Sequence, residues 1–345
     1  MKKQFKVGSL FAGVGGICLG FMNATNPDAE FVMSWANEID EFACETFRHN
    51  FKHTLLEGDI NLILHPEKSD NVDYYTQLKE RILAEPIDIL DGGFPCQAFS
   101  IAGEQKGFND ERGNLFMSFI DLINQLDAKF GKKPRILFLE NVKNLKSHDK
   151  GRTYQVIKSK LEESGYTIKE CVLNTMLYSN LPQNRERIYI VGFRTKKVFE
   201  KFTFPEPIPL KKTIHDVIDF INPVDEKYLY TKGKYKGDIY EKLVAAMDDS
   251  DAVYQWRRKY VRKNMSGVVP TLTANQGEGG HNVCLVKTKQ GIRKMTPKEC
   301  FNTQGFPESF VLPDIADGRL YKQAGNSVCV SVIQRIAEQM LVAMK

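Results

Sequence analysis

The chain has 345 residues, of which 48 are basic and 43 acidic, so its net charge is +5. Its hydrophobic fraction of 42% and charged fraction of 26% are ordinary for a soluble globular protein, and no apolar run predicts a membrane span or a signal peptide. Seven cysteines without a Cys-x-x-Cys pair argue against a disulfide framework and a zinc site, so we expect a reduced cytoplasmic protein without a structural metal.

The N-terminal segment predicts a strand, a glycine turn and a helix. Residues 5–10 form a strand-like run, Gly13, Gly15 and Gly16 make the turn, and apolar residues follow at helical spacing. Glycines at such a turn let a ligand approach the backbone N–H groups at the start of the helix. Because Cys18 occupies the place of the third glycine in the dinucleotide fingerprint, an ordinary strand-to-helix turn fits equally well.

Acidic residues follow the next two predicted strands. Glu38 comes after the strand-like residues 31–36, and Asp59 comes after an apolar pair and Gly58. An acid about 20 residues beyond a glycine turn is where such folds bind ribose hydroxyls, although Glu38 also fits an exposed helix cap. Together the three strand ends predict a nucleoside-bearing cofactor across the edge of the sheet.

The stretch from Asp91 to Ser100 follows an apolar run at residues 87–90, which predicts the end of a buried strand. Two glycines and a proline then predict a loop that places Cys96 at the carboxyl edge of the sheet, where open α/β proteins have their active sites. Cys96 is therefore a candidate nucleophile. On this stretch alone, a small buried residue that fills a gap is the favoured interpretation.

Strands and helices continue to alternate beyond this loop. We interpret residues 61–86 as a charged surface connection that contains a helix-like piece around residues 74–83. Residues 115–126 predict an amphipathic helix, and Glu140 ends a further strand. Three apolar runs predict strands at residues 135–139, 166–173 and 187–193. The alternation predicts an α/β fold with a doubly wound, mostly parallel sheet.

The pattern changes near residue 197, and we predict three parts: residues 1–196, an inserted domain at 197–296, and a C-terminal return at 297–345. The insert carries a basic run with interleaved aromatic residues at 253–265, which fits either phosphate contacts or a solvated face. A polar glycine-rich loop follows it. The last part predicts a closing helix from Gln323 onward, with a core stripe of Val332, Ile333, Ile336, Met340 and Leu341.

Five motifs, in this order, carry a resemblance to one family. The sequence resembles the cytosine-5 DNA methyltransferases of bacterial restriction-modification systems over nearly its whole length except the insert. The motifs are Phe11-Ala12-Gly13-Val14-Gly15-Gly16, Gly93-Phe94-Pro95-Cys96-Gln97, Glu140-Asn141-Val142, Gln183-Asn184-Arg185-Glu186-Arg187 and Gly325-Asn326-Ser327-Val328.

The resemblance implies a Rossmann-like catalytic domain that binds S-adenosyl-L-methionine and releases S-adenosyl-L-homocysteine, without a metal. The insert would be a smaller target-recognition domain, with double-stranded DNA as the partner in the cleft. The reaction would transfer a methyl group to C5 of a flipped-out cytosine in a short specific site. The family also implies a monomer that pairs functionally with a cognate restriction endonuclease, without a required physical contact.

The resemblance also implies the roles of individual residues. Cys96 would attack C6 of cytosine, Glu140 would donate a proton to N3, Arg187 would hold O2, and Arg185 would support Glu140. The predicted cofactor-binding residues are Phe11, Gly13, Gly15, Gly16, Glu38, Ile39, Asp59, Ile60, Pro95, Leu115, Asn326 and Val328. The predicted DNA-binding residues are Gln97, Ser100, Arg257, Arg258, Arg262, Lys263, Thr271 and Thr273.

This chain departs from the family at two of these places. Relatives often carry an aromatic residue at the position of Ile39, which would lie against adenine, and some carry a serine at the position of Ala102. In the family, the loop at residues 99–114 would close over the flipped base.

Other functions explain the sequence less completely. A nicotinamide dehydrogenase shares the glycine turn and the ribose acid but not the thiol, the acid and the arginine pair. A transfer-RNA cytosine-5 methyltransferase of the same fold typically has a Cys-Phe-Thr triplet, whereas Cys300 and Phe301 are followed here by Asn302. A DNA-binding protein without activity would lack Cys96 or Glu140, and both are present.

Overall fold

The computed structural model describes residues 2–94, 114–235, 237–257, 259–276 and 282–345. The chain forms two compact units. Unit 1 comprises residues 1–173, 186–205 and 333–345, and unit 2 comprises residues 174–185 and 206–332. Most of the segment that we predicted to return to the first domain, up to residue 332, therefore clusters with the insert.

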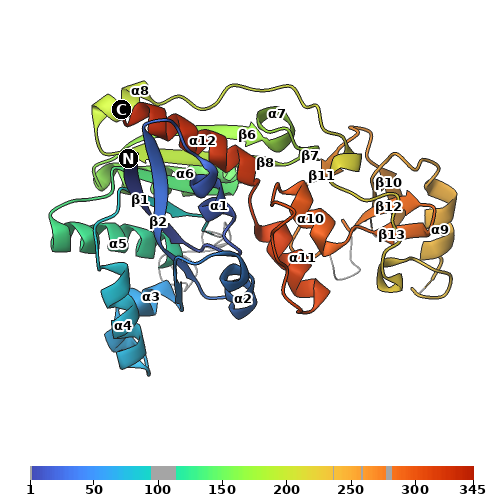
Figure 1. Cartoon of the computed structure of the whole chain (residues 1–345), viewed down its shortest axis with the longest axis horizontal. Coiled ribbons are helices and arrows are strands. Elements are labelled where there is room, and N and C mark those ends of the chain that lie inside the picture. The colour runs from blue at the N-terminus through green and yellow to red at the C-terminus, as the bar shows by residue number, and fades with distance from the viewer. Residues whose placement is uncertain (1, 95–113, 236, 258, 277–281) are drawn as a thin grey trace. The chain divides into compact units, whose positions relative to one another are not determined.

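Unit 1 contains a seven-stranded sheet in the order β3-β2-β1-β4-β5-β8-β6, of which β1, β2, β6 and β8 are labelled in Figure 1. The strands are β1 (Lys3–Leu10), β2 (Ala29–Glu38), β3 (Thr54–Glu57), β4 (Ile89–Gly92), β5 (Ile136–Val142), β6 (Thr167–Asn174) and β8 (Glu186–Phe193). The pairs from β3 to β5 are parallel, whereas β8 runs antiparallel to β5. The predicted mostly parallel α/β sheet is confirmed.

Helices cover both faces of this sheet. Leu137 and Leu139 of β5 share one buried core with residues of α3, α4, α5 and α6. On the opposite face, Phe21 packs edge-on against Phe31 of β2 and Phe138 of β5, with ring centroids 5.0 and 5.6 Å away. The helices are α1 (Gly16–Asn23), α2 (Glu41–Asn50), α3 (Ile60–Leu64), α4 (Val72–Ile82), α5 (Asn114–Phe130), α6 (Arg152–Glu163) and α8 (Lys196–Lys201).

The helix-like piece predicted around residues 74–83 is confirmed as α4, but the interpretation of residues 61–86 as a surface connection was wrong. Ile63, Leu64, Leu78 and Ile82 are buried in the same core, so α3 and α4 are structural elements of unit 1. The charged residues of α4 surround its two buried residues and hid this buried face in the sequence.

The strand order reverses between β1 and β4, which is the point where open α/β sheets bind ligands. In the parallel register, Leu10 of β1 lies beside Gly92 of β4, and Gly92 lies beside Leu139 of β5. The glycine turn, the segment beginning at Gly93 and the acid Glu140 therefore leave three adjacent strands at one level of the sheet edge.

Unit 2 is built on a four-stranded antiparallel sheet in the order β10-β9-β12-β13. Its strands are β9 (Tyr254–Arg257), β10 (Tyr260–Lys263), β12 (Cys284–Thr288) and β13 (Gly291–Lys294), and a separate parallel pair joins β7 (Gln183–Asn184) to β11 (Val269–Pro270). Its helices are α7 (Thr175–Tyr178), α9 (Ile239–Ala246), α10 (Pro297–Thr303), α11 (Asp317–Asn326) and the start of α12 (Val330–Ala343). Short 3-10 helices are η1 (Pro66–Lys68), η3 (Lys143–Lys146) and η4 (His148–Gly151) in unit 1, and η5 (Ile214–Asp216) and η6 (Glu226–Tyr228) in unit 2.

The closing helix begins later than the sequence predicted. Gln323 lies in the last turns of α11, Ser327 is extended with ψ 176°, and the new helix starts at Val330. The predicted core stripe of α12 is buried as expected.

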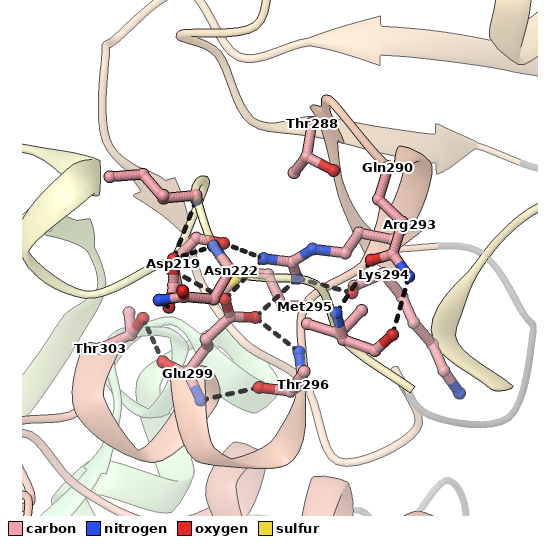
Figure 2. A network of polar contacts seen from close by, with 12 residues as sticks. Asp219, Asn222, Thr288, Gln290, Arg293, Lys294, Met295, Thr296, Glu299 and Thr303 are labelled. Atoms are coloured by element: carbon pink, nitrogen blue, oxygen red, sulfur yellow. Dashed lines mark hydrogen bonds and ion pairs between the residues drawn. The ribbon is translucent and has the colours of Figure 1, made fainter. Parts of the chain in front are cut away.

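A buried ion pair organises the end of β13 (Figure 2). Arg293 is 0% exposed, and its Nη1 and Nη2 contact Oε2 and Oε1 of Glu299 at 2.8 and 2.7 Å. Glu299 also accepts the backbone N–H groups of Thr296 (2.7 Å) and Asp219 (2.9 Å), and Arg293 donates to the carbonyl of Asp219 (2.6 Å). The pair thus joins β13, the capped start of α10 and the turn at Asp219.

We predict that the two partners of this ion pair are energetically coupled. Arg293→Met should lower the free energy of unfolding by about 3–5 kcal/mol, because it leaves the Glu299 carboxylate buried without its cation. Adding Glu299→Leu should lower the free energy of unfolding less in the Arg293→Met background than in the wild type. Urea unfolding of both single variants and the double variant measures this coupling, and strictly additive losses would contradict it.

Candidate functional site

A pocket of about 370 Å³ opens at the carboxyl edge of the unit 1 sheet. It is lined by Phe11, Asn37, Glu38, Ile39, Gly58, Asp59, Ile60, Asn61 and Leu115. Six of these nine residues, from four separate strand ends and helix starts, are predicted cofactor-binding residues. The structure therefore brings together side chains that are spread over more than a hundred residues of sequence.

The glycine turn and Glu38 form one wall of the site. Phe11, Gly13 and Gly15 have φ values of 56°, 55° and 84°, and a Cβ atom on Gly15 would lie 2.3 Å from the ring of Phe51. Glu38 accepts the N–H of Gly13 at 2.7 Å through Oε2, and the N–H groups of the two residues after it at 2.8 Å through Oε1. The carboxylate is therefore held in one orientation, with lone pairs left for hydroxyl groups of a ligand.

Asp59 and Asn61 form the other polar wall. Asp59 Oδ1 accepts the backbone N–H of Asn61 at 2.8 Å and its side-chain Nδ2 at 3.0 Å. Asn61 Oδ1 in turn accepts a hydrogen bond from Ser118 of α5. Ile39, which is 66% exposed, presents an apolar side chain at the pocket. Two oriented carboxylates and apolar side chains suit the hydroxyls, amino group and ring of a nucleoside.

Sequence reasoning missed Asn37 and Asn61. Asn37 is buried and donates through Nδ2 to the carbonyls of Leu56 and Gly58, both at 2.9 Å, while its own carbonyl accepts the N–H of Ala12. It thereby ties the ends of β2 and β3 to the glycine turn. The sequence signal that could have identified them is their position: Asn37 is adjacent to Glu38, and Asn61 is two residues after Asp59.

Glu140 and Arg187 form an ion pair on β5 and β8. Arg187 Nε lies 3.1 Å from Glu140 Oε1, and the two side chains are only 14% and 11% exposed. A Cβ atom on Gly93 would lie 3.8 Å from Glu140 Oε2, so the carboxyl group stands beside the segment that leaves β4. Asn141 Nδ2 donates to the carbonyl of Phe94 at 2.8 Å and anchors the same segment.

Five predicted site residues lie outside the described residues. They are Pro95, Cys96, Gln97, Ser100 and Arg258, together with most of the predicted closing loop at 99–114. Their predicted roles stay predictions. In the glycine turn, Gly13 precedes α1, Gly15 is its N-cap and Gly16 is its first residue, as the predicted turn requires.

Arg185 lies in unit 2 and is 2% exposed. Its guanidinium donates to the carbonyls of Leu272 (3.2 Å), Gly325 (3.2 Å) and Ser327. The predicted support of Glu140 by Arg185 stays a prediction. Asn326 and Val328 also belong to unit 2. Asn326 is exposed and lies between Gly325 and Ser327, whereas Val328 is buried and follows Ser327.

The predicted DNA-binding residues of unit 2 lie in two places. Arg257, Arg262 and Lys263 are on the β9–β10 hairpin. Arg257 donates to Asn282 Oδ1, Arg262 is exposed, and hydrogen bonds from Lys263 to two aspartates, Asp249 and Asp248, raise the pKa of its ammonium group. Thr271 and Thr273 follow β11, and their hydroxyls bond Asn184 O (2.7 Å) and Asn275 Oδ1 (3.0 Å).

Asp91, at the centre of the sheet, is a buried acid that sequence reasoning did not use. It pairs in register with Ser9 of β1, whose hydroxyl donates to Asp91 Oδ1 at 2.7 Å. Oδ2 is buried without a hydrogen-bond partner among the described residues. Burial raises the pKa of Asp91 well above its ordinary value, against a smaller lowering by the bond from Ser9. Burial, and secondarily the charge of Asp91, also raises the pKa of the Cys18 thiol.

Within the described parts of the chain, no cluster of three His, Cys, Asp or Glu residues could hold a metal ion. No helix in these parts is both long and apolar enough to cross a bilayer.

Comparisons with known proteins agree on one family. The model of the C-5 cytosine-specific DNA methylases matches residues 5–342. The Type II methyltransferase M.Bsp6I of Bacillus sp. (strain RFL6) is 50% identical over 342 residues, which cover 99% of this chain and 100% of that protein. M.SsoII of Shigella sonnei is 38% identical over 340 residues, covering 98% and 80%. The crystal structure of a DNMT2 variant from Spodoptera frugiperda has a TM-score of 0.70 at 21% identity, covering 98% of this chain and 99% of that one, and shows the same fold.

We predict that Asp91→Asn becomes more stable relative to the wild type as the pH rises. The folded-state pKa of Asp91 lies above its unfolded-state value. Below about pH 4 the carboxyl group is protonated in both states, so it does not change the free energy of unfolding. Above that pH ionisation favours the unfolded state, so the free energy of unfolding falls as the pH rises toward the folded-state pKa. Asparagine does not ionise and removes this loss.

Urea unfolding of both proteins at several pH values from about 5 to 9 measures the difference in their free energies of unfolding. The exposed Asp314→Asn variant controls for the change in net charge. A difference between Asp91→Asn and wild type that does not change with pH would contradict the prediction.

Proposed function

We propose that this chain, which belongs to the C-5 cytosine-specific DNA methylase family, methylates C5 of a flipped-out cytosine in a short specific site of double-stranded DNA. The observation that carries the proposal is the Glu140–Arg187 ion pair at the same sheet edge as a pocket shaped for a nucleoside. S-adenosyl-L-methionine supplies an electrophilic methyl group on a sulfonium when it is bound.

The pocket residues account for binding and orientation of this cofactor. Glu38, fixed by three backbone N–H groups, would accept the two ribose hydroxyls. Asp59 would accept from the adenine amino group, with Ile39 and Ile60 against the ring. Gly13, Gly15 and Gly16 leave room for the amino-acid part to approach the backbone, and Asn326 and Val328 would complete the site.

The chemistry needs a nucleophile, because C5 of cytosine reacts poorly with a methyl sulfonium. The Cys96 thiolate would attack C6 and form an S–C6 bond, which moves the electron pair of the C5–C6 double bond into the ring. C5 then acts as an enamine carbon and takes the methyl group. A base, either a side chain or water, removes the C5 proton, and the electrons of that C–H bond restore the double bond as Cys96 leaves.

Glu140 and Arg187 would stabilise the charge that builds on the ring. Glu140 would donate a proton to N3 through the oxygen that faces the segment after β4, and it would take this proton back as Cys96 leaves. Arg187 holds the other oxygen at 3.1 Å and would reach O2 of the base with its remaining N–H groups. Because a stacked base cannot reach these groups, the cytosine must rotate out of the duplex.

The names of the relatives, which describe Type II methyltransferases, support the proposed biological setting. The enzyme would act in the cytoplasm as a monomer and protect DNA from a cognate restriction endonuclease without contacting it. The exposed Arg262 and its neighbours on the hairpin would contact phosphates or bases.

We predict that expression in a host without cytosine methylation will place 5-methylcytosine at one short plasmid site. Cys96→Ser should abolish the modification, because an alcohol is a far weaker nucleophile than a thiolate. Glu140→Gln should lower the single-turnover rate by about 100-fold or more, since it removes the proton donor. Sequencing that detects 5-methylcytosine measures the first effect, and radiolabelled methyl transfer measures the second.

Cys171→Ser and the exposed Glu308→Gln are matched controls outside the site and should retain activity. A Cys96→Ser protein that still methylates would overturn the covalent mechanism. If 5-methylcytosine appears in the transfer RNA of the host and not in the plasmid, the RNA methyltransferase alternative holds instead.

We also predict that Asn61→Ala weakens binding of S-adenosyl-L-homocysteine by about 5–10-fold, because Asp59 loses the side chain that orients it. The loss should be smaller for an analogue with hypoxanthine in place of adenine, which lacks the amino group. Isothermal titration calorimetry measures both affinities, with the exposed Asn144→Ala as control. Equal losses for the two ligands would show that Asn61 does not act through Asp59.

A further inference from the structure

Arg185 connects two segments of unit 2 that are far apart in sequence. Its guanidinium donates to the carbonyl of Leu272 and to the carbonyls of Gly325 and Ser327. Leu272 lies between Thr271 and Thr273, whereas Gly325 and Ser327 lie on either side of Asn326. Thr271 and Thr273 of the first segment are predicted to contact DNA, and Asn326 and Val328 of the second are predicted to contact the cofactor.

The two segments also touch directly. A Cβ atom on Gly325 would lie 2.3 Å from the carbonyl carbon of Thr273 and 2.4 Å from the backbone nitrogen of Ala274. These are backbone atoms, so they cannot yield as the end of a flexible side chain would. Gly325 is therefore needed for the close approach of the two backbones, which pack against each other with no side chain between them.

The strand that carries Arg185 is itself bound to the first segment. Gln183 and Asn184 of β7 pair with Val269 and Pro270 of β11, and Thr271 donates its hydroxyl to Asn184 O at 2.7 Å. The guanidinium is planar and presents its N–H groups in a fixed fork, so three carbonyls bound to it hold a fixed geometry. Without it, these carbonyls would lose a charge-assisted donor in a buried place.

We propose that Arg185 is a positioning residue that couples DNA binding to cofactor binding by holding residues 271–274 and 325–328 in one arrangement. This inference rests on the proposed function. A ligand that orders either segment would order the other through Arg185 and Gly325, so each ligand raises the affinity for the other. Thermodynamic linkage requires the two increases to be equal.

The coupling differs from a role in the chemical step. A residue that only supports Glu140 would change the single-turnover rate at saturating ligands and leave the linkage between the two binding events intact. A residue that couples the segments changes the linkage whatever its effect on the rate. The ratio of affinities with and without the second ligand therefore separates the two roles.

The experiment measures the dissociation constant of S-adenosyl-L-homocysteine with and without a duplex that carries the mapped site, and that of the duplex with and without S-adenosyl-L-homocysteine. In the full-length wild type we expect each ligand to tighten the other by about 5-fold or more, by the same factor in both directions. In Arg185→Gln, the factor by which each ligand tightens binding of the other should fall close to 1. Arg185→Lys should fall between them, because an ammonium donates to fewer carbonyls in fixed geometry.

Two further variants keep the test decisive. Lys289→Gln removes a positive charge from an exposed turn of unit 2 and should keep the wild-type factor. Gly325→Ala displaces Thr273 and Ala274 while Arg185 itself is kept, and should lower the factor in the same way. If Arg185→Gln does not fold, Arg185→Lys and Gly325→Ala decide the outcome.

Two results would overturn the inference: no linkage in the wild type, or a wild-type factor in every folded Arg185 and Gly325 variant. A wild-type protein that binds neither ligand and leaves no 5-methylcytosine would contradict the proposed function itself, which is a different failure.

Discussion

The site of unit 1 depends on the register in which β1, β4 and β5 are hydrogen-bonded. Leu10, Gly92 and Leu139 lie side by side, so the glycine turn and the segment beginning at Gly93 leave the sheet at the level of Glu140. A shift by one residue would turn Glu140 to the opposite face of β5, away from Arg187. The antiparallel pairing of β8 adds the second requirement, because it brings Arg187 back toward the same edge.

The sequence predicted the residues of this site that follow the end of a predicted strand. Glu38 and Asp59 stand two and three residues after the ends of apolar runs, and the pocket contains both. For Asn61 the sequence offered only its position two residues after Asp59, and its hydrogen bond from Ser118, which is 57 residues away, could not be predicted. The partners of Arg185 are 87, 140 and 142 residues away, and no local pattern indicates a guanidinium that binds backbone carbonyls. The break before α12 escaped prediction because no proline occurs between Ser327 and Val330.

The charge of the insert has a different distribution from what its composition indicated. The basic run at 253–265 was interpreted as either a phosphate-binding or a solvated face, but its members have different surroundings. Lys263 is paired with two aspartates and Arg257 with Asn282, while Arg262 is exposed. Residues outside the run therefore neutralise or engage part of it. Of these three side chains, Arg262 is the one whose surroundings best suit a contact with a phosphate.

In unit 2 buried arginines fix distant segments against one another, whereas in unit 1 strand pairing does so. Its strands have two to five residues, so they supply few ladder hydrogen bonds to fix one segment against another. Arg293 and Arg185 each bind carbonyls of segments distant in sequence, and Arg293 carries its counter-ion Glu299 with it. A guanidinium can satisfy several carbonyls at once in a set geometry, which a longer ladder would otherwise do. Because segments distant in sequence can then approach as closely as Gly325 and Thr273 do, unit 2 holds such segments in a defined arrangement without long strands.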